Sequence, residues 1–422
     1  MIPPRALRGW ALLLIALLGS LSLGLWGLTT ERVEPVSVLM PAPFADATAE
    51  LVSAFNRSHP RIALSVTRGP LETEAVSDLA ISSLLLGESP YDLLLMDVSW
   101  TPKYAAAGWL EPLDRWLGPD ALSDLAPGAE LGNAFSGQLW RFPLVADMGL
   151  LYWRTDLMDA PPRTPAELVA ISRRLQREGR VPWGYVWQGK QYEGLSCVVL
   201  EVLRGFGGQW LVENKPQLDS PAAVAATGWL QDLVRQGITP EAVANMGEPE
   251  ALQLFQAGDA AFMRNWPYAW AELNKPDSPL RGKVAFTTMV SEEGKPHAAT
   301  QGSWGLSLLA GSEHKAAAVE VLRFLTSAEA QKQLNLRWGY TPTRLSVFED
   351  PELLAANPVL ADLQQALAAA VLRPLSPVYA QLSDLLYRDV NTVITGDQPA
   401  PSAMRELQSN SERLLRSSGG EG

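Results

Sequence analysis

The stretch YDLLLMDVSW, residues 91–100, decides the fold that the sequence predicts. Four consecutive apolar residues followed by Asp97 are typical of a short buried strand. Two further runs, 34–40 and 62–66, also resemble strands, and amphipathic helical patterns over 44–58 and 75–87 separate the three. This alternation of strand and helix predicts a parallel α/β sheet.

Asp97 and Trp100 stand at the carboxyl end of this predicted strand. Ligands of open α/β sheets bind beyond the carboxyl ends of strands, which makes Asp97 a candidate binding residue. The structural alternative is that Asp97 only caps the turn that follows.

The rest of the chain continues the α/β pattern. Strand-like runs at 139–145 and 149–154 leave Asp147 between them, and Thr164, Pro165 and Gly179 mark the start and stop of a helix. Further segments suggest a helix, turn and strand over 250–265, strands at 283–290 and 304–310, one or two helices at 314–336, and a mostly helical tail.

Composition limits the functional classes. The 422 residues suffice for two domains, and 47% hydrophobic with 19% charged residues describes a globular protein. A net charge of −12 argues against a nucleic acid partner. Cys197 is the only cysteine, so an intramolecular disulfide and a cysteine-rich metal site are excluded; we expect it to be buried packing. We expect no cofactor and no metal.

The N-terminus carries an export pattern. Arg5 and Arg8 precede an uncharged apolar segment over residues 9–28, as in a signal peptide, but the segment is also long enough to span a bilayer. The basic flank places that end in the cytoplasm and the body outside the inner membrane. We therefore exclude residues 1–32 from the fold, as a cleaved signal or an uncleaved membrane anchor.

Five short segments place aromatic rings beside carboxylate, amide or guanidinium groups, and Arg373 in LRPLSPVY adds a sixth. The five are MDVSW (96–100), LVADMG (144–149), VWQGKQYEGL (186–195), NWPYAW (265–270) and QGSWG (301–305). We expect each at the end of an element. Indole faces suit the apolar faces of a sugar ring, and planar polar groups bind its hydroxyls in pairs. Each charge-assisted bond contributes about 1.5–3 kcal/mol. This chemistry predicts a carbohydrate site.

Longer motifs carry a family resemblance. The strings LLLMDVSW, AGWLEPLD, DMGLLYWRTDL, GYVWQGKQYEGL, RNWPYAW and RPLSPVY resemble the bacterial extracellular solute-binding proteins of ABC importers, in particular the trehalose/maltose-binding subgroup. The resemblance implies a two-lobe type II periplasmic binding protein fold, each lobe a mixed sheet flanked by helices, with the ligand in the cleft and a hinge between the lobes. It also implies a non-enzymatic monomer in the periplasm that docks on ABC permease subunits in the inner membrane.

The resemblance also implies a set of ligand contacts. Two carboxylates accept from sugar hydroxyls, two indoles stack on sugar rings, and one guanidinium donates to hydroxyls or holds a carboxylate in place. The residues concerned are Asp97, Asp147, Trp266, Trp304, Gly302 and Arg373, with Tyr192 and Glu193 in the family signature and Asp46 as an approximate equivalent of an acidic contact.

Structural interpretations stand beside these roles. Asp147 is alternatively a hinge or capping residue, and the two indoles are alternatively core. Arg373 is alternatively one member of a structural ion pair, and Glu193 an orienting partner of Tyr192 or Arg373. We interpret Trp153 and Trp229 as packing.

One departure from the subgroup bears on the ligand. The family has an arginine in the first long helix, whereas this chain has Val76 and Ser77 in the corresponding stretch. The lost contact weakens the case for trehalose or maltose and admits another neutral disaccharide or glucoside, such as sucrose or glucosylglycerol.

We expect one lobe to comprise residues 33–143 and 297–344, and the other to comprise 144–296 and 345–416. Two other functional classes remain open from the residues alone. A glycoside hydrolase would use two of the carboxylates Asp97, Asp147 and Glu193. A membrane-tethered adaptor would keep the cleft in a degenerate form.

Overall fold

The computed structural model describes residues 33–87, 89–118 and 120–418. The export pattern predicted over residues 1–32 lies outside the described residues. Between Val33 and Ser418, again without residues 88 and 119, no helix has the length and hydropathy needed to cross a bilayer.

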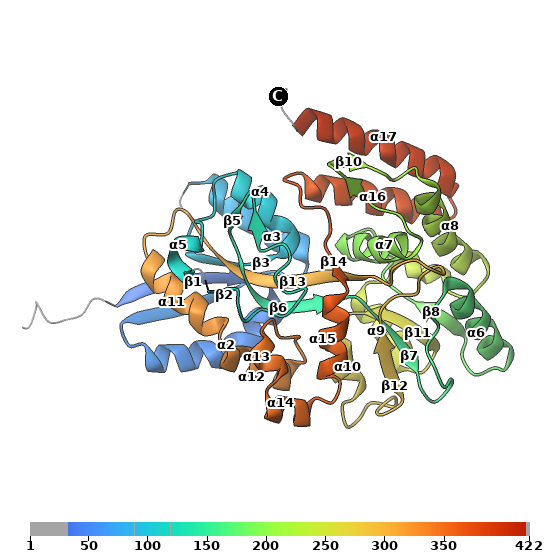
Figure 1. The fold of residues 1–422 in the computed structure, drawn as a ribbon, viewed down its shortest axis with the longest axis horizontal. Coiled ribbons are helices and arrows are strands. Elements are labelled where there is room, and N and C mark those ends of the chain that lie inside the picture. Colours follow the sequence, from blue (N-terminus) through green and yellow to red (C-terminus); the bar gives the residue numbers. More distant parts are fainter. Residues whose placement is uncertain (1–32, 88, 119, 419–422) are drawn as a thin grey trace, which may run out of the picture.

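A six-stranded sheet forms the first half of the molecule (Figure 1). Its path is β14-β13-β3-β1-β2, with β6 also paired to β13. The strands are β1 (Glu34–Met40), β2 (Ile62–Arg68), β3 (Leu93–Asp97), β6 (Phe142–Met148), β13 (Ala299–Leu308) and β14 (Ala370–Val371). β1 is parallel to both β2 and β3, which confirms the predicted parallel unit, whereas β13 is antiparallel to β3 and β6.

Helices and short turns cover this six-stranded half. They are α2 (Ala42–Ser58), α3 (Thr73–Leu85), the 3₁₀ turn η1 (Val98–Trp100), α4 (Thr101–Ala106), α5 (Asp114–Leu117), α11 (Lys315–Leu325) and α12 (Ala328–Trp338), with the hairpin β4 (Ala134–Phe135) and β5 (Gln138–Leu139). α2 places Phe44, Leu51 and Phe55 in the core at helical spacing. The predicted single or double helix over 314–336 is thus two helices.

A four-stranded sheet of order β12-β7-β11-β8 forms the second half. Its strands are β7 (Leu150–Arg154), β8 (Trp183–Val186), β11 (Ala260–Asn265) and β12 (Val284–Thr287). Around it lie α6 (Pro165–Arg177), α7 (Glu193–Gly205), β9 (Leu211–Val212), β10 (Lys215–Pro216), α8 (Pro221–Arg235), η2 (Glu241–Asn245), α9 (Glu248–Gln256) and α10 (Tyr268–Leu273). The Thr164 side chain caps α6 in a capping box with Glu167, and Gly179 follows at φ 64°, as predicted.

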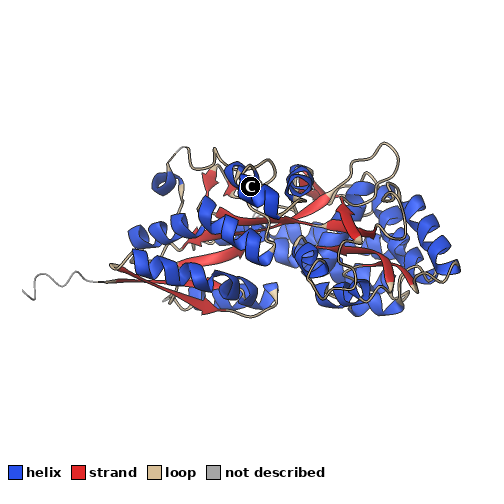
Figure 2. Ribbon diagram, turned by 90° about the horizontal axis from the view of Figure 1, so that it is seen from below, coloured by secondary structure: helices blue, strands red, loops and turns tan. Residues whose placement is uncertain are grey.

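The C-terminal segment is helical, as expected. It contains α13 (Leu345–Phe348), α14 (Pro351–Ala356), α15 (Leu360–Ala368), α16 (Tyr379–Ile394) and α17 (Ala400–Ser418). α16 and α17 pack into the same apolar core as α7 and α8, which also holds Trp153 and, at its edge, Trp229. Cys197, within α7, is buried as a free thiol, as its predicted packing role requires. Figure 2 shows helices on both sides of the strands in both halves.

One expectation about element ends was wrong, because Gly302 and Trp304 lie inside the ten-residue strand β13. The segment LVADMG does cover the end of a strand, with Asp147 as the next-to-last residue of β6. β13 alternates between buried Gln301 and Ser303 and half-buried Gly302 and Trp304, which places the latter two on one face. Gln, Gly and Ser have low strand propensity, so the sequence pattern indicated only the apolar end of this strand.

The two halves are joined where β6 runs into β7. Gly149 connects these strands, and its amide donates to the carbonyl of Thr300 at 3.0 Å. A Cβ on Gly149 would lie 1.8 Å from Glu201 Oε1 and 2.4 Å from Arg264 Nη2. Glu201 and Arg264 form an ion pair at 2.6 Å whose side chains are both 0% exposed, so they have no room to move away.

Gly149→Ala is therefore expected to destabilise the protein by about 1–3 kcal/mol, the cost of overpacking a close-packed interior. Urea unfolding measures the change. Gly228→Ala in α8 is the matched control, because a Cβ there meets nothing within 4 Å. The control should be neutral or stabilising, since Ala favours helix over Gly. Equal stabilities of the two variants would contradict the proposed close approach.

Candidate functional site

Asp97 ends β3 and meets Arg373. Its Oδ1 accepts from the Ser99 amide at 2.8 Å and from Ser99 Oγ at 2.6 Å, so the side chain does cap η1. Arg373 Nη2 also donates to Oδ1 at 2.8 Å and to Oδ2 at 2.9 Å. The structural interpretation of Asp97 as a turn cap is thus confirmed, and its predicted ligand contact stays a prediction.

Arg373 continues this network to Glu193, the first residue of α7. Its Nη1 donates to Glu193 Oε1 at 2.7 Å, and its side chain is only 2% exposed. Tyr379 and Ser383 hydroxyls also donate to the Glu193 carboxylate. Burial raises the pKa of Glu193, while Arg373 and these hydroxyls oppose that shift. Glu193 therefore orients Arg373, one of its two predicted partners.

Trp304 lies opposite Asp97 in the register of β13 and β3. Its ring meets Trp100 edge-on, with centroids 5.6 Å apart, and packs at 5.3 Å against Phe44. Phe44 in turn stacks on Tyr340 at 4.9 Å. Four rings from separate segments thus form one aromatic cluster: Trp304, Trp100, Phe44 and Tyr340.

Trp266 follows β11 and approaches the same strand. A Cβ on Gly302 would lie 2.7 Å from the Trp266 ring, so the indole needs glycine at that position. The Arg264 guanidinium lies 4.0 Å from the ring centroid on an aromatic face, and Trp266 Nε1 donates to Glu248 Oε1 at 3.0 Å. The indole is only half-buried, so part of its surface remains accessible.

Tyr192 is joined to Trp266 through Glu248. The Tyr192 hydroxyl donates to Glu248 Oε2 at 2.6 Å. Burial raises the pKa of the Tyr192 phenol well above its ordinary value, and the Glu248 carboxylate adds to that shift. Sequence reasoning missed Glu248, because its Gly-Glu-Pro-Glu context reads only as the start of a helix.

Asp147 lies opposite Gly302 in the register of β6 and β13. Its Oδ1 accepts from the Thr341 amide at 3.2 Å. Burial raises the pKa of the carboxyl to about 7, which the hydrogen bond from Thr341 only partly offsets. Asp147, Gly302 and Trp266 therefore lie together on adjacent segments.

The protonation of Asp147 makes stability depend on pH. The side-chain pKa of an aspartate in an unfolded chain is about 3.9, whereas the pKa of Asp147 in the folded protein is about 7. The folded state therefore holds the proton more tightly. The protonated carboxyl contributes its full stabilisation below about pH 4. This stabilisation decreases as the pH rises from there to about 7, by up to about 1.4 kcal/mol per pH unit.

Asp147→Asn should abolish this part of the pH dependence. Urea midpoints of both proteins between pH 4.5 and 8 measure it, and the wild type should lose stability relative to the variant as pH rises. Parallel curves would show that the carboxyl does not titrate in this window. Other buried acids with raised pKa values are common to both proteins and cancel in the difference.

Asp46 lies near the edge of this group: burial raises the pKa of the Tyr340 phenol, and the charges of Asp147 and Asp46 add to that shift. Asp46 is exposed on α2 and pairs with Arg68 at 2.9 Å, whereas Phe44, two residues earlier, is the one that reaches Trp304. No hydrogen bond or ion pair joins Asp46 to another predicted site residue within the described ranges. Phe44 was missed in the sequence because a single ring in an amphipathic helix is indistinguishable from core.

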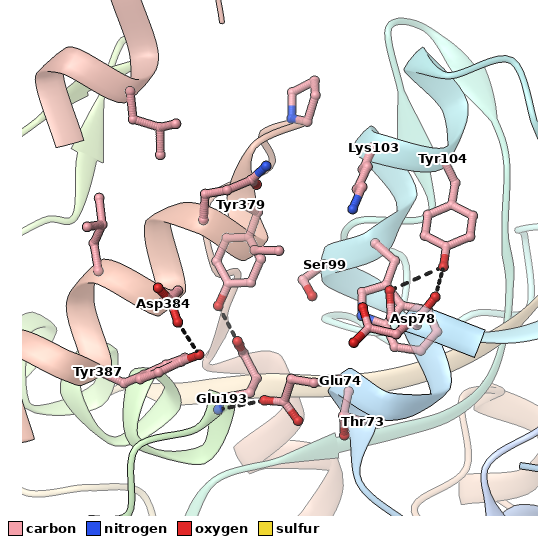
Figure 3. Close-up of a pocket in the computed structure, with 17 residues that line it drawn as sticks. Thr73, Glu74, Asp78, Ser99, Lys103, Tyr104, Glu193, Tyr379, Asp384 and Tyr387 are labelled. Carbon is pink, nitrogen blue, oxygen red and sulfur yellow. Dashed lines mark hydrogen bonds between the residues drawn. The ribbon is translucent and has the colours of Figure 1, made fainter. Parts of the chain in front are cut away.

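A cavity of about 450 Å³ lies between the two halves, next to the network (Figure 3). α3, η1 and α4 form one wall, and α16 and α17 form the other. It shares Ser99, Trp100, Glu193 and Tyr379 with the site already described, and Glu193 is the one predicted site residue in its lining. Its size is within the range of small-molecule sites, and its lining combines rings with polar groups, including Tyr104 and Tyr379.

The described residues offer no metal chemistry: no group of three His, Cys, Asp or Glu side chains among them is arranged to hold an ion. The site instead combines half-exposed indoles with buried hydrogen-bonding groups. This arrangement can bind a polar ring by stacking and by hydrogen bonds.

Comparisons with known proteins agree with this geometry. The family model described as bacterial extracellular solute-binding protein matches residues 41–332. A probable ABC transporter-binding protein of Deinococcus radiodurans is 33% identical over 359 residues, which is 82% of this chain and 85% of that protein. The maltotriose-binding protein of Pyrococcus abyssi is 27% identical over 302 residues, 69% of this chain and 62% of that protein.

Solved structures confirm the predicted type II periplasmic binding protein fold. The structure of maltose-bound T. maritima MalE3 superposes with a TM-score of 0.84 at 33% identity, covering 90% of this chain and 99% of that one.

Proposed function

Because the chain belongs to the bacterial extracellular solute-binding proteins, the sugar-binding, non-enzymatic components of ABC transporters, we propose that it binds a neutral disaccharide or glucoside between its two halves. The candidates are trehalose, maltose, sucrose and glucosylglycerol. The glycoside hydrolase alternative is excluded by this family membership. The network fits the same conclusion, since Asp97 and Glu193 are both bound to Arg373.

The observation that carries the proposal is the grouping on one face of β13. Trp304 and Gly302 are half-buried on that face, Trp266 lies against Gly302, and Asp147 is its register partner. Two partly accessible indoles near a carboxylate suit a sugar ring, whose faces are apolar and whose edges carry hydroxyls.

A second observation supports a polar ligand at the network. The Nε of Arg373 is buried, and within the described chain it has no hydrogen-bond partner. An unpaired buried donor is costly, by about 1–3 kcal/mol, so a ligand hydroxyl that accepts from it would gain most of that energy.

Binding is proposed to close the molecule. We propose that residues 33–143 and 297–344 form one lobe and residues 144–296 and 345–416 form the other. The six-stranded sheet extends beyond these bounds, because it also includes β6 up to Met148 and the short strand β14. A ligand that contacts both lobes stabilises the closed arrangement through hinge rotation. The hinge would include Gly149 and its partner Thr300, where the chain crosses between the sheets.

The partners follow from the family. Proteins of this family are exported and interact with permease components of the transporter. Our finer proposal is a periplasmic monomer that delivers its ligand to an inner-membrane permease pair. Whether residues 1–32 are cleaved or retained as an anchor is testable by N-terminal sequencing of the protein recovered from its producing cells.

Calorimetry of the purified protein against trehalose, maltose, sucrose and glucosylglycerol tests the function. We expect one of the four to bind with unit stoichiometry and, at 100-fold excess over its dissociation constant, to stabilise the protein by about 2.7 kcal/mol. Chromatography should find the sugar unchanged. Failure of all four would rule out the proposed ligand class, and release of monosaccharide would reinstate the hydrolase.

A further inference from the structure

The N-terminal ends of α3 and α7 touch across the gap between the two halves. The amide of Glu193 donates to Glu74 Oε1 at 2.9 Å, which Figure 3 shows at the lower end of the cavity. One turn away, Lys190 Nζ lies 3.5 Å from Glu72 Oε1. We call these two contacts, made by Glu72 and Glu74 to Lys190 and the Glu193 amide, the acidic latch.

The two ends belong to different cores. α3 buries Val76 and Ala80 against Leu94 and Tyr104, in a cluster of the six-stranded half. α7 buries Leu195 and Val198 in the cluster of the four-stranded half, together with α8 and α16. The latch thus lies between two distinct cores, while a third cluster, with Ala146 and Ala299 of the six-stranded sheet and Met263 of the four-stranded sheet, packs where the sheets join.

The chemistry of the latch favours a weak, reversible contact. Glu74 places a carboxylate on an amide of the first turn of a 13-residue helix, where the helix dipole and the charge both strengthen the bond. Glu72 and Lys190 have side chains 70% and 49% exposed, so water and salt screen their attraction. Arg373, by contrast, links the halves through buried groups that salt does not reach.

We propose that the acidic latch holds the ligand-free protein partly closed and thereby sets its affinity. This inference rests on one part of the proposed function, namely that the ligand binds between the two halves. A binding-competent state that is populated in advance raises the apparent affinity in proportion to its population. Glu72 and Glu74 thus regulate binding through closure. Because Glu74 also lines the cavity, the separation of the halves in the ligand-free protein, and not the affinity alone, identifies this role.

Distance measurements on the ligand-free full protein test the latch directly. Spin labels on Ser82→Cys in α3 and Arg235→Cys in α8 report the separation of the halves, and the native Cys197 is buried and does not react. We expect a short-distance population at low salt that shrinks in 0.5 M salt. Glu72→Ala/Glu74→Ala should shift the distribution toward the long distance already at low salt, while the buried ion pairs of Arg373, which this variant keeps, still hold part of the population closed.

Two further variants control for trivial effects. Glu50→Ala removes another exposed ion pair, with Arg337, but both partners lie in the six-stranded half on α2 and α12, so the distances should not change. Glu74→Gln keeps an oxygen that accepts the Glu193 amide but removes the charge, and should give an intermediate distribution.

The outcomes are separable from those of ligand identification. Identical distance distributions for the wild type and the double variant at every salt concentration would overturn the latch, whatever the ligand is. Once a ligand is known, the double variant should bind it roughly threefold to tenfold more weakly. Unchanged affinity in a variant whose halves have opened would overturn the coupling of the latch to binding.

Discussion

Trp266→Ala is expected to weaken ligand binding by about 2–4 kcal/mol, roughly 30-fold to 700-fold in the dissociation constant. The half-buried indole is held in place by Gly302 behind it, Arg264 over its face and Glu248 at its Nε1. A ring fixed in this way offers stacking area without a large loss of side-chain entropy on binding. Calorimetry with the ligand that the wild type binds measures the effect.

Trp116→Ala is the matched control. Trp116 lies in α5 and contacts Glu111 and Arg323 within the six-stranded half, away from Gly302. It should lose stability but no affinity. If Trp266→Ala binds the ligand as tightly as the wild type, the Trp266 ring has only a packing role. The ligand would then bind in the cavity between α3 and α16 and not against β13.

Arg373→Met is expected to destabilise the fold by about 3–5 kcal/mol, because removing one partner leaves buried charge uncompensated. The guanidinium joins Asp97 of the six-stranded half to Glu193 of the four-stranded half. Without it, each carboxylate keeps only neutral donors, from Ser99 on one side and from Tyr379 and Ser383 on the other. Urea unfolding of the ligand-free protein measures the loss.

The control for charge removal is Arg174→Met. Arg174 forms an exposed pair with Glu178 on α6, and its loss should change stability by less than about 0.5 kcal/mol. Arg373→Lys should recover part of the stability, since one ammonium replaces one of the two ion pairs. A stability of Arg373→Met equal to that of the control would mean that Asp97 and Glu193 are satisfied without the guanidinium.

Local patterns predicted much of the fold. The apolar run before Asp97, the helix predicted over 44–58 and the capped helix after Thr164 were all confirmed. These features depend on the spacing of apolar residues and on capping side chains a few positions away, and both can be read from one sequence. β13 was only partly predicted, because its first half contains glycine and polar residues, which do not indicate a strand. Gly302 stands there because the Trp266 ring approaches it closely, which only the tertiary structure reveals.

The candidate site divides in the same way. The residue types and the family motifs indicated Asp97, Arg373, Trp266 and Trp304. In the structure, Arg373 donates to Asp97, and Trp304 is the register partner of Asp97 on the neighbouring strand. Glu248, Phe44, Tyr379 and Ser383 were not predicted, although each contacts a predicted residue. Asp46 is exposed and paired with Arg68, and its ligand contact stays a prediction.

The sequence by itself determined the α/β class, the family and the ring-and-carboxylate chemistry of the site, because these depend on residue types and on spacings of a few positions. Only the tertiary structure decided which groups meet. Arg373 and Asp97 are 276 positions apart and Glu74 and Glu193 are 119 apart, and no local pattern encodes such pairs. These contacts exist because the two sheets meet along one boundary. The buried carboxylate of Asp97 is costly without a partner there and meets Arg373, whereas the exposed Glu74 is held by the geometry of the two helix ends.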